Sequence, residues 1–300
     1  WTKMSADRAK KGEAMAGKLY ICATPIGNLE DITFRVVRML KEVDLIAAED
    51  TRHSVKLLNH FDIHTPMTSY HEYNKMYKGR KFVDKLKQGM NIALITDAGT
   101  PGISDPGEEL VALAWEAGIE VSVLPGAVAC VTALTLSGLP TRRFSFEAFL
   151  PSAKKQRKKV IEELKEESRT IVLYEAPHRL YRTLKELRKV LGGTRKLIVC
   201  REMTKRYETV FRTTLAEACV HYQKEIPKGE YVLVLEGKAR KNSREKQEIW
   251  KAMTLEQQMV YYINQGFDQK KAMKQVAKNR CCTKREVYQQ LIVHSKDDTL

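Results

Sequence analysis

The residues best suited to bind a small ligand form one loop, residues 97–107, which reads Asp-Ala-Gly-Thr-Pro-Gly-Ile-Ser-Asp-Pro-Gly. Three glycines and two prolines in eleven residues make a stiff loop with open backbone N–H groups. An apolar run directly before it predicts a strand over 91–96. Ligands of α/β folds bind at the carboxyl ends of parallel strands, and ordinary connections are shorter, so the loop predicts a ligand site.

Charged side chains near the ends of the predicted strands are suited to acid–base chemistry or to positioning a substrate. They are Glu49, Asp50, Arg52, Asp97, Glu202, Lys205 and Glu208. Each has an equally good structural interpretation, as part of a solvated face or of an ion pair. Among the histidines, we expect His178 to cap or pack a helix, whereas His53 is the better candidate for a cleft.

Several known catalytic patterns are absent from the sequence. No G-x-G-x-x-G follows the first strand, and neither G-x-S-x-G nor H-E-x-x-H occurs. Residues 12–18 resemble a P-loop, but Leu19 stands where Ser or Thr is required, and the match precedes the first strand. The six cysteines form no C-x-x-C pair, so we expect no metal site, no disulfide framework and a reducing cytoplasmic location.

The composition is that of a globular protein with a strong positive charge. The 300 residues suffice for two domains, and 43% hydrophobic with 30% charged residues exclude wholesale disorder. Lys and Arg exceed Asp and Glu by 52 to 37, and a net charge of +15 favours polyanionic partners such as RNA. The longest uncharged stretch, 121–141, contains Pro125 and Pro140, so we expect a strand, a turn and a helix rather than a membrane span.

Predicted strands and helices alternate in the first half of the chain, and they position the loop. The strands fall at 18–23, 44–48, 91–96 and 119–124, and the helices at about 32–43, 52–60, 74–87, 108–117 and 127–138. Such alternation implies a mainly parallel sheet that is covered on both faces.

The second half has fewer helices and ends in a basic segment. Strands are predicted at 143–150, 170–175, 196–202, 208–213 and 230–236, with a helix at 177–191 and a basic helix after the first strand. Capping boxes begin two of three short helices that follow, at Thr254 and Thr283. We therefore expect a flexible leader (1–17), an N-terminal α/β domain (18–138), a C-terminal α/β domain (139–237), and a basic linker with a helix-turn-helix-like tail (238–300).

Six motifs in a fixed order give the chain a resemblance to a known family. They are residues 24–33 (TPIGNLEDIT), 48–52 (AEDTR), 97–107, 124–126 (LPG), 174–179 (YEAPHR) and 201–205 (REMTK). With these motifs, residues 18–237 closely resemble the ribosomal RNA small-subunit methyltransferase I family, and the helical tail does so more loosely. Departures are slight: Thr96 and Ala176 stand where Ser is usual, and Ala148 where Gly is usual.

The resemblance implies a fold and a reaction. The fold is two α/β domains of the tetrapyrrole-methylase type with the donor cleft between them, plus a small C-terminal helical domain. The reaction is transfer of a methyl group from S-adenosylmethionine to the 2′-oxygen of a cytidine in the decoding region of 16S rRNA, within the small ribosomal subunit. The family resemblance also implies a homodimer, and the cysteine usage and the lack of a predicted membrane span add a cytoplasmic location without a membrane partner.

The resemblance also assigns roles to residues. Those expected to bind the methyl donor are Pro25, Asp97, Ala98, Gly99, Thr100, Ile103, Val128, Ala129, Tyr174 and Glu175. The cleft residues are chosen instead from the charged side chains near the predicted strand ends. Those expected to position or deprotonate the ribose are Glu49, Asp50, Arg52, Glu202 and Lys205. The residues do not identify which of the five is the base.

Phosphate contacts are expected from a basic run and from the basic linker around 238–244. The run comprises Lys154, Lys155, Arg157, Lys158 and Lys159. Tyr70, Tyr73 and Tyr77 would either stack on unpaired bases or pack in the protein.

Two other functions remain open at this point. One is a methylase of a small tetrapyrrole-like substrate, because a fold does not settle a substrate. The other is a non-catalytic ribosome-assembly protein that binds RNA. The basic excess argues against the first, and the intact loop at 97–107 argues against the second.

Overall fold

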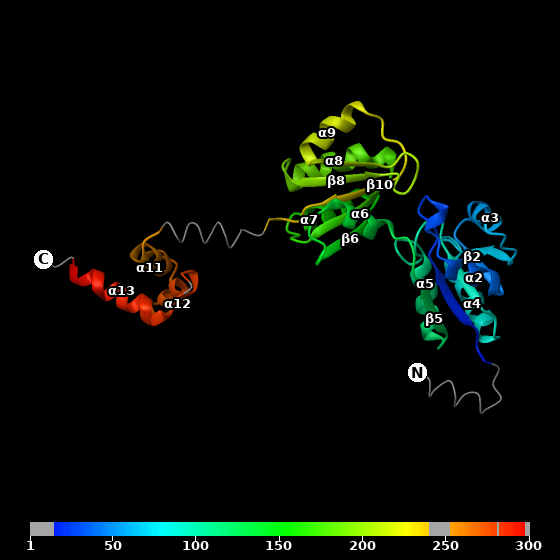
Figure 1. Ribbon diagram of the computed structural model, residues 1–300, viewed down its shortest axis with the longest axis horizontal. Helices are drawn as coiled ribbons and strands as arrows, with labels where there is room; N and C mark the ends of the chain where they lie inside the picture. Colours follow the sequence, from blue (N-terminus) through cyan, green and yellow to red (C-terminus); the bar gives the residue numbers. More distant parts are fainter. Residues whose placement is uncertain (1–14, 240–252, 281, 298–300) are drawn as a thin grey trace. The chain divides into compact units, whose positions relative to one another are not determined.

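A computed structural model describes residues 15–239, 253–280 and 282–297 (Figure 1). The chain divides into two compact units, residues 1–238 and residues 239–300. The predicted leader and the linker that follows residue 238 lie mostly outside the described residues. The last leader residue, Gly17, is buried, and its N–H donates to the carbonyl oxygen of Leu86 at 2.7 Å, so it is part of the packed unit.

The first half of the larger unit contains a five-stranded sheet whose paired strands all run parallel, as predicted. The strand order is β3-β2-β4-β1-β5. The bounds are β1 Lys18–Cys22, β2 Leu45–Ala48, β3 Met67–Ser69, β4 Ile92–Ile95 and β5 Glu120–Leu124. The central strands are runs of apolar residues, as expected for a sheet that is buried on both faces.

Helices cover both faces of this sheet because successive strand side chains point to opposite sides. In β4, Ile92 and Leu94 join one hydrophobic cluster, whereas Ala93 and Ile95 join the other. The first cluster packs under α4 (Lys75–Lys87) and α5 (Gly107–Glu116). The second packs under α2 (Phe34–Glu42) and α3 (Thr51–His60), and a short 3₁₀ helix, η1 (Leu29–Asp31), precedes α2.

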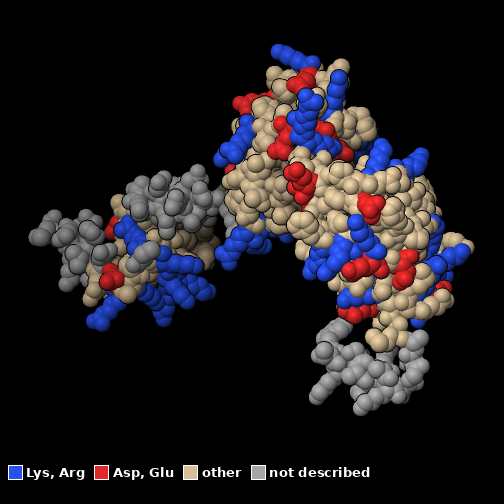
Figure 2. Space-filling view, turned by 45° about the vertical axis from the view of Figure 1, so that its right-hand side comes forward, with Lys and Arg blue, Asp and Glu red and all other residues tan. Residues whose placement is uncertain are grey.

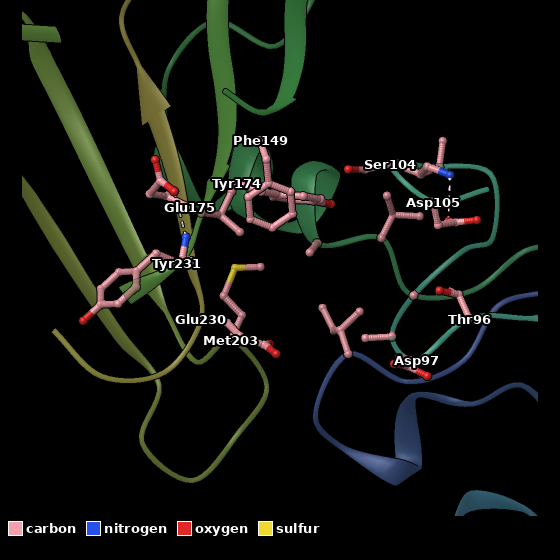
Figure 3. Close-up of a pocket in the computed structure, with 18 of the residues that line it drawn as sticks. Thr96, Asp97, Ser104, Asp105, Phe149, Tyr174, Glu175, Met203, Glu230 and Tyr231 are labelled. Atoms are coloured by element: carbon pink, nitrogen blue, oxygen red, sulfur yellow. Dashed lines mark hydrogen bonds between the residues drawn. The ribbon is translucent and has the colours of Figure 1, made fainter. Parts of the chain in front are cut away.

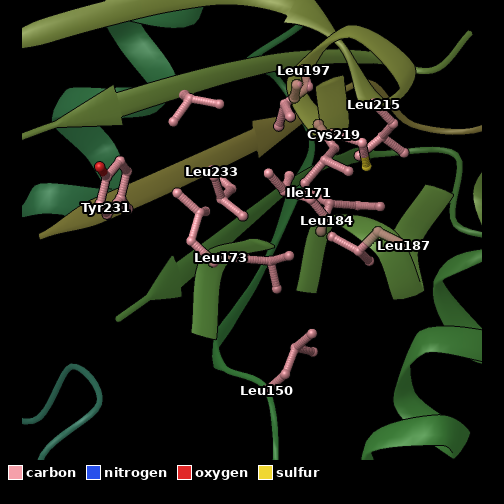
Figure 4. Packing of buried hydrophobic residues seen from close by; sticks show 14 of the residues in the cluster. Leu150, Ile171, Leu173, Leu184, Leu187, Leu197, Leu215, Cys219, Tyr231 and Leu233 are labelled. Atoms are coloured by element: carbon pink, nitrogen blue, oxygen red, sulfur yellow. The ribbon is translucent and has the colours of Figure 1, made fainter. Parts of the chain in front are cut away.

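The second sheet is mixed and has the order β6-β7-β10-β8-β9. Only the β6–β7 pair is parallel. The strands are β6 Phe144–Phe149, β7 Thr170–Glu175, β8 Lys196–Arg201, β9 Thr209–Thr214 and β10 Tyr231–Leu235. Leucines of this sheet pack against the helices α7 (Lys154–Leu164), α8 (Pro177–Leu191) and α9 (Leu215–Lys224) in one large cluster (Figure 4).

Helix α6 (Ala129–Ser137) joins the two halves of the unit. It precedes the predicted domain boundary at 138/139, yet its buried residues Cys130, Ala133 and Leu134 pack on the second sheet. Their partners there include Val172 and Val232. The side chains of α6 are small, which permits this close packing, and one hydrophobic cluster therefore spans residues from both predicted α/β domains.

Strand β6 contains a β-bulge. Phe146 pairs with Val172 and Phe149 pairs with Tyr174, so three steps along β6 match two steps along β7. Ala148, inside the bulge, has a φ of +47°, in the left-handed region that glycine adopts with least strain. It is also the position at which the resemblance described above gives glycine as the usual residue.

The smaller unit contains three helices in its described residues, α11 (Leu255–Asn264), α12 (Gln269–Asn279) and α13 (Lys284–Asp297). The predicted capping boxes are present: the Thr254 hydroxyl accepts the Gln257 N–H at 3.2 Å, and that of Thr283 accepts the Glu286 N–H at 3.3 Å. The helices enclose a core of their own. Among all the described residues, no helix combines the length and the apolar character needed to cross a bilayer.

Candidate functional site

A pocket of about 480 Å³ lies between the two sheets, which is within the size range of small-ligand sites (Figure 3). One wall is the loop after β4, and the other comes from β7, β10 and the turn after β8. Except for Pro25, every residue predicted to bind the donor lines it: Asp97, Ala98, Gly99, Thr100, Ile103, Val128, Ala129, Tyr174 and Glu175. Pro25 is buried and does not line the pocket, whereas its neighbour Ile26 does.

The loop wall is held to the turn after β1 through Gly99. Gly99 and Thr24 exchange backbone hydrogen bonds of 2.8 and 3.1 Å. Gly99 has a φ of +86°, and a Cβ there would lie 3.3 Å from Cγ2 of Ile26 and 3.4 Å from the carbonyl oxygen of Ala127. The Thr100 hydroxyl donates to that same carbonyl oxygen at 3.2 Å. This turn of the loop therefore requires glycine, and its hydrogen bonds hold it to the turn after β1.

Asp105 stabilises the rest of the loop. Its carboxylate accepts the N–H groups of Gly102, Ile103 and Gly107 at 2.8–3.2 Å. Burial raises the pKa of Asp105, and the three N–H groups oppose that rise. The sequence analysis did not single out this residue, although an Asp in a Gly- and Pro-rich turn is a common acceptor of local N–H groups.

The wall from the second sheet is mostly apolar. It includes Phe149, Tyr174, Cys200, Met203 and Val232, and of these only Tyr174 was predicted. The Tyr174 hydroxyl accepts the Cys130 N–H at 3.0 Å, and burial raises the pKa of the phenol. The ring of Tyr174 lies edge-on to that of Phe149, with 5.7 Å between ring centroids.

Glu175, at the end of β7, is almost fully buried among positive charges. Arg179 Nε lies 3.4 Å and Arg157 Nη2 lies 3.9 Å from its carboxylate oxygens. The Thr183 hydroxyl also donates to this carboxylate, and the Ala176 N–H donates to it at 2.9 Å. These donors stabilise a carboxylate that burial alone would strongly destabilise.

The prediction that Arg157 contacts RNA is wrong. Its side chain is 4% exposed. Nε donates to Glu186 at 2.5 Å, and Nη2 donates to the Thr183 hydroxyl at 2.6 Å. Arg157 shares the inner face of α7 with Ile161 and Leu164, so its role is in the interior. The other members of the basic run, Lys154, Lys155, Lys158 and Lys159, are exposed.

Of the five charged residues predicted in the cleft, only Glu49 lines the pocket. Its carboxylate accepts the hydroxyl of Thr96. Asp50 caps α3 instead, and it forms an ion pair of 2.7 Å with Arg52, whose side chain is 89% exposed. The hydrogen bonds from Arg52 lower the pKa of Asp50 well below its usual range, so Asp50 is a poor base.

Glu202 and Lys205 lie in the turn after β8, beside the pocket residue Glu230. Lys205 Nζ is 3.0 Å from a carboxylate oxygen of both Glu202 and Glu230. Although burial raises the pKa of Glu202, the Glu230 N–H and the Lys205 ammonium outweigh that effect and lower it. The three residues therefore form an ion-pair cluster at the rim.

Asp97 is the carboxylate at the beginning of the loop. Its Oδ1 accepts the Asp50 N–H at 3.1 Å and lies 4.0 Å from His53 Nδ1. Burial raises the pKa of Asp97, and the nearby charge of Glu49 raises it further. Asp97 thus contacts the segment that follows β2, the segment that also carries the pocket residue Glu49.

The remaining candidates are on the surface or in the core. Tyr70 is buried against Phe82, whereas Tyr73 and Tyr77 are exposed. In the view of Figure 2, Lys and Arg side chains are prominent on the described helices of the smaller unit. Within the described ranges, no group of three or more His, Cys, Asp or Glu side chains is arranged to hold a metal.

Comparisons with solved structures identify the fold. The uroporphyrin-III C-methyltransferase of Thermus thermophilus superposes with a TM-score of 0.53 at 19% identity, over 73% of this chain and 94% of that protein. The cobalt precorrin-4 methyltransferase CbiF gives 0.53 at 18% identity, over 72% of this chain and 94% of that one. At such identities the likeness concerns the fold alone.

Sequence comparisons identify the family. The family described as Tetrapyrrole (Corrin/Porphyrin) Methylases matches residues 18–219. A protein of Halalkalibacterium halodurans named Ribosomal RNA small subunit methyltransferase I is 52% identical over 274 residues, which cover 91% of this chain and 93% of that protein. A protein of the same name from Bacillus subtilis is 46% identical, over 92% of this chain and 94% of that one. The chain therefore belongs to the ribosomal RNA small subunit methyltransferase I family, within the tetrapyrrole methylases.

Proposed function

We propose that this protein transfers a methyl group from S-adenosylmethionine to the 2′-oxygen of a cytidine in the decoding region of 16S rRNA, within the small ribosomal subunit. The observation that carries the proposal is the two-walled pocket, in a chain about half identical over most of its length to proteins named as rRNA methyltransferases. Methyltransferases of this family use S-adenosylmethionine.

The pocket suits this donor in shape and charge. The donor supplies a methyl group on a positively charged sulfur, so the transfer requires orientation rather than a metal. The carboxylates Glu49, Asp97 and Glu230 line the pocket and favour a cationic ligand. The rigid Ala98–Thr100 turn offers backbone groups, and Val128–Ala129, Tyr174 and the apolar wall would hold the flat, less polar part of the donor.

The charge of the surface supports an RNA substrate. Four exposed lysines lie on α7, namely Lys154, Lys155, Lys158 and Lys159, and Arg52 is exposed beside the pocket. Neutralisation of phosphates by such residues supplies most nonspecific affinity for RNA. Site specificity then depends on the rRNA structure that reaches the pocket.

We also propose that the protein acts as a cytoplasmic homodimer. Strand β5 is an edge of the first sheet, and it exposes 56% of Val123. The adjoining helix α6 exposes 48% of Val131 and 37% of Leu136. Apolar side chains exposed beside an unpaired strand edge favour burial against a second copy. Sedimentation equilibrium of the full chain tests this expectation.

The test of the function is methyl transfer from labelled S-adenosylmethionine. Small subunits that lack the modification are compared with naked 16S rRNA, and the product is located by mass spectrometry. We expect a single 2′-O-methylcytidine in the decoding region. Donor binding without transfer to either RNA substrate would contradict the proposal and would direct the search to small tetrapyrrole acceptors.

The variant Gly99→Arg separates catalysis from RNA binding. Gly99 has a left-handed φ and little space around a Cβ, so a long side chain would distort the loop wall. We expect transfer to be lost while RNA affinity stays within about twofold. An equal loss of RNA affinity would mean that the loop is an RNA contact, which would leave the donor-site assignment unsupported.

A further inference from the structure

Five carboxylates line the pocket, and they differ in the number of hydrogen-bond and ion-pair partners that the protein itself supplies to them. Glu175 is surrounded by two arginines, a hydroxyl and a backbone N–H. Asp105 accepts three N–H groups, and Glu230 is paired with Lys205. Donors of the protein itself therefore already contact these three carboxylates, which leaves them poorly placed to receive a proton from a substrate hydroxyl.

The other two, Glu49 and Asp97, lie on the wall formed by the first sheet. Glu49 accepts the Thr96 hydroxyl. Within the described part of the chain, the one hydrogen bond that Asp97 receives is from the Asp50 N–H, on Oδ1. Asp97 Oδ2 therefore remains available to a ligand, and its side chain is 42% exposed at the pocket.

We infer that Asp97 is the group that accepts the proton of the ribose 2′-hydroxyl, and that His53 and Glu49 set the pH range in which it can do so. This inference rests on the proposed function. It moves Asp97 from the donor-binding residues, where the family resemblance placed it, to the reacting hydroxyl. It also excludes Asp50, Glu202 and Lys205 as the base, since each is held in an ion pair.

Methyl transfer to the 2′-oxygen is coupled to the loss of its proton. As the 2′-oxygen forms its bond to the methyl carbon, the 2′-O–H bond breaks and its proton passes to the Asp97 carboxylate. The bond between the methyl carbon and sulfur breaks, and its electron pair remains on sulfur as a neutral thioether. His53 lies at the surface, with 61% of its side chain exposed and Nδ1 4.0 Å from Asp97, so it offers a path for the proton to water.

The charges around Asp97 predict opposite effects of its two neighbours. The groups that act on it are Glu49, Asp50 and His53, all from the segment after β2, and the negative charge of Glu49 raises its pKa while a protonated His53 lowers it. Asp97 must be ionised to accept a proton, so activity rises with pH through its pKa and is lost below it. The acidic limb of the rate profile is therefore the measurement that reports Asp97.

The first experiment removes the carboxylate. The Asp97→Asn variant of the full chain is assayed for kcat on small subunits, and its affinity for S-adenosylmethionine is measured by calorimetry. We expect kcat to fall by about 100-fold or more, the usual contribution of a general base, while donor affinity changes less than about threefold. Loss of donor affinity equal to the loss of rate would assign Asp97 to donor binding and overturn the inference.

The second experiment moves the acidic limb of kcat against pH. Glu49→Gln is expected to shift it down by about 0.5 pH unit and His53→Gln up by a similar amount, as neighbouring charges in a solvated pocket require. Glu116→Gln, an exposed charge change at the end of α5, serves as the matched control and should leave the limb in place. The inference would be overturned if neither Glu49→Gln nor His53→Gln shifted the acidic limb of kcat against pH. It would also be overturned if Glu49→Gln alone removed that limb.

The two proposals fail in different ways. If the wild-type chain methylates no RNA, the proposed function fails. If the wild type methylates the small subunit and Asp97→Asn does so at a similar rate, only the inference fails.

Discussion

Replacing Arg157 with methionine should destabilise the protein without weakening its hold on RNA. Arg157 is buried between β7 and α8, where it contacts Glu175, Thr183 and Glu186. Removing one partner from a buried ion pair usually costs about 3–5 kcal/mol, because the other charge stays buried. Here Arg179 remains beside Glu175, and Arg182 remains 3.0 Å from Glu186, so we expect the lower end of that range, about 3 kcal/mol.

The assay is urea unfolding of the full chain, followed by far-UV circular dichroism. A loss of about 3 kcal/mol in a unit of this size corresponds to a fall in Tm of about 6–12 °C. Lys158→Met is the matched control, because it removes an exposed positive charge from the outer face of the same helix. It should change the free energy of unfolding by less than about 0.5 kcal/mol.

In RNA binding, the exposed-residue variant Lys158→Met should have the larger effect, whereas in unfolding Arg157→Met has the larger effect. Lys158→Met should lower the slope of log affinity against log salt by up to about 0.9, whereas Arg157→Met should leave the slope unchanged. A stable Arg157→Met protein, or one that remains folded but loses RNA affinity as Lys158→Met does, would refute the assignment of Arg157 to the interior.

The destabilisation by Arg157→Met should also depend on pH. Burial raises the pKa of Glu186, but Arg157 and Arg182 outweigh burial and hold it below its usual value. A lowered carboxyl pKa stabilises the fold above the ordinary pKa of about 4.3, and this stabilisation is lost as the pH falls through the lowered value. The difference between wild type and variant should therefore be full at neutral pH and should shrink below about pH 4.

Three further predictions concern the walls of the pocket. Ala148→Gly should raise the free energy of unfolding by about 0.5–1 kcal/mol in urea melts, because relief of the left-handed strain exceeds the entropic cost of glycine; a lower value would contradict this. Tyr174→Phe should lower the free energy of unfolding by about 1 kcal/mol, since the Cys130 N–H loses its acceptor, and an unchanged value would count against that bond. Asp105→Ala should weaken donor binding by about tenfold or more in calorimetry, because three N–H groups of the loop lose their acceptor; an unaltered Kd would show that the loop holds its shape without it.

The first half of the fold was predictable because its signals are local. Apart from the three-residue β3, each strand of the first sheet is visible in the sequence as a run of apolar residues. Most of these runs are followed by a helix whose apolar residues recur at helical spacing, as Val36 and Leu40 do in α2. Alternation of this kind leaves few arrangements other than a parallel sheet. The ends of parallel strands share one edge of the sheet, and Glu49 and Asp97, which follow β2 and β4, are found in one pocket.

One strand and one α-helix were not predicted from the sequence: the strand is very short, and the helix begins directly at the end of another strand. Strand β3 has only three residues, Met67–Ser69, too few for a period to show. Helix α9 follows β9 without a loop, although Thr214 and Glu217 form a capping box that marks its start. The second wall of the pocket was missed because Phe149, Cys200 and Val232 are far apart in sequence, and only the pairing of β-strands brings them together.

Arg157 shows a different limit. In sequence it belongs to a run of positive charges, and its type is that of an RNA contact. Its position in the helix, however, is that of a core residue, because the apolar residues Ile161 and Leu164 follow four and seven residues later and lie on the same face of α7. Spacing outweighs residue type here because Glu175 and Glu186 neutralise the buried guanidinium.

The bulge in β6 makes the pocket sensitive to the number of residues in that strand. Side chains of a regular strand alternate between the two faces, so residues an odd number apart face opposite ways. Phe146 and Phe149 are three residues apart, yet both rings contact Tyr174. The extra residue of the bulge lies between them and brings their side chains to the same face of the sheet. Deleting Ala148 would remove the bulge and restore the regular alternation of side chains, which would turn Phe149 away from the pocket. A one-residue deletion should therefore harm this wall more than any single substitution within it.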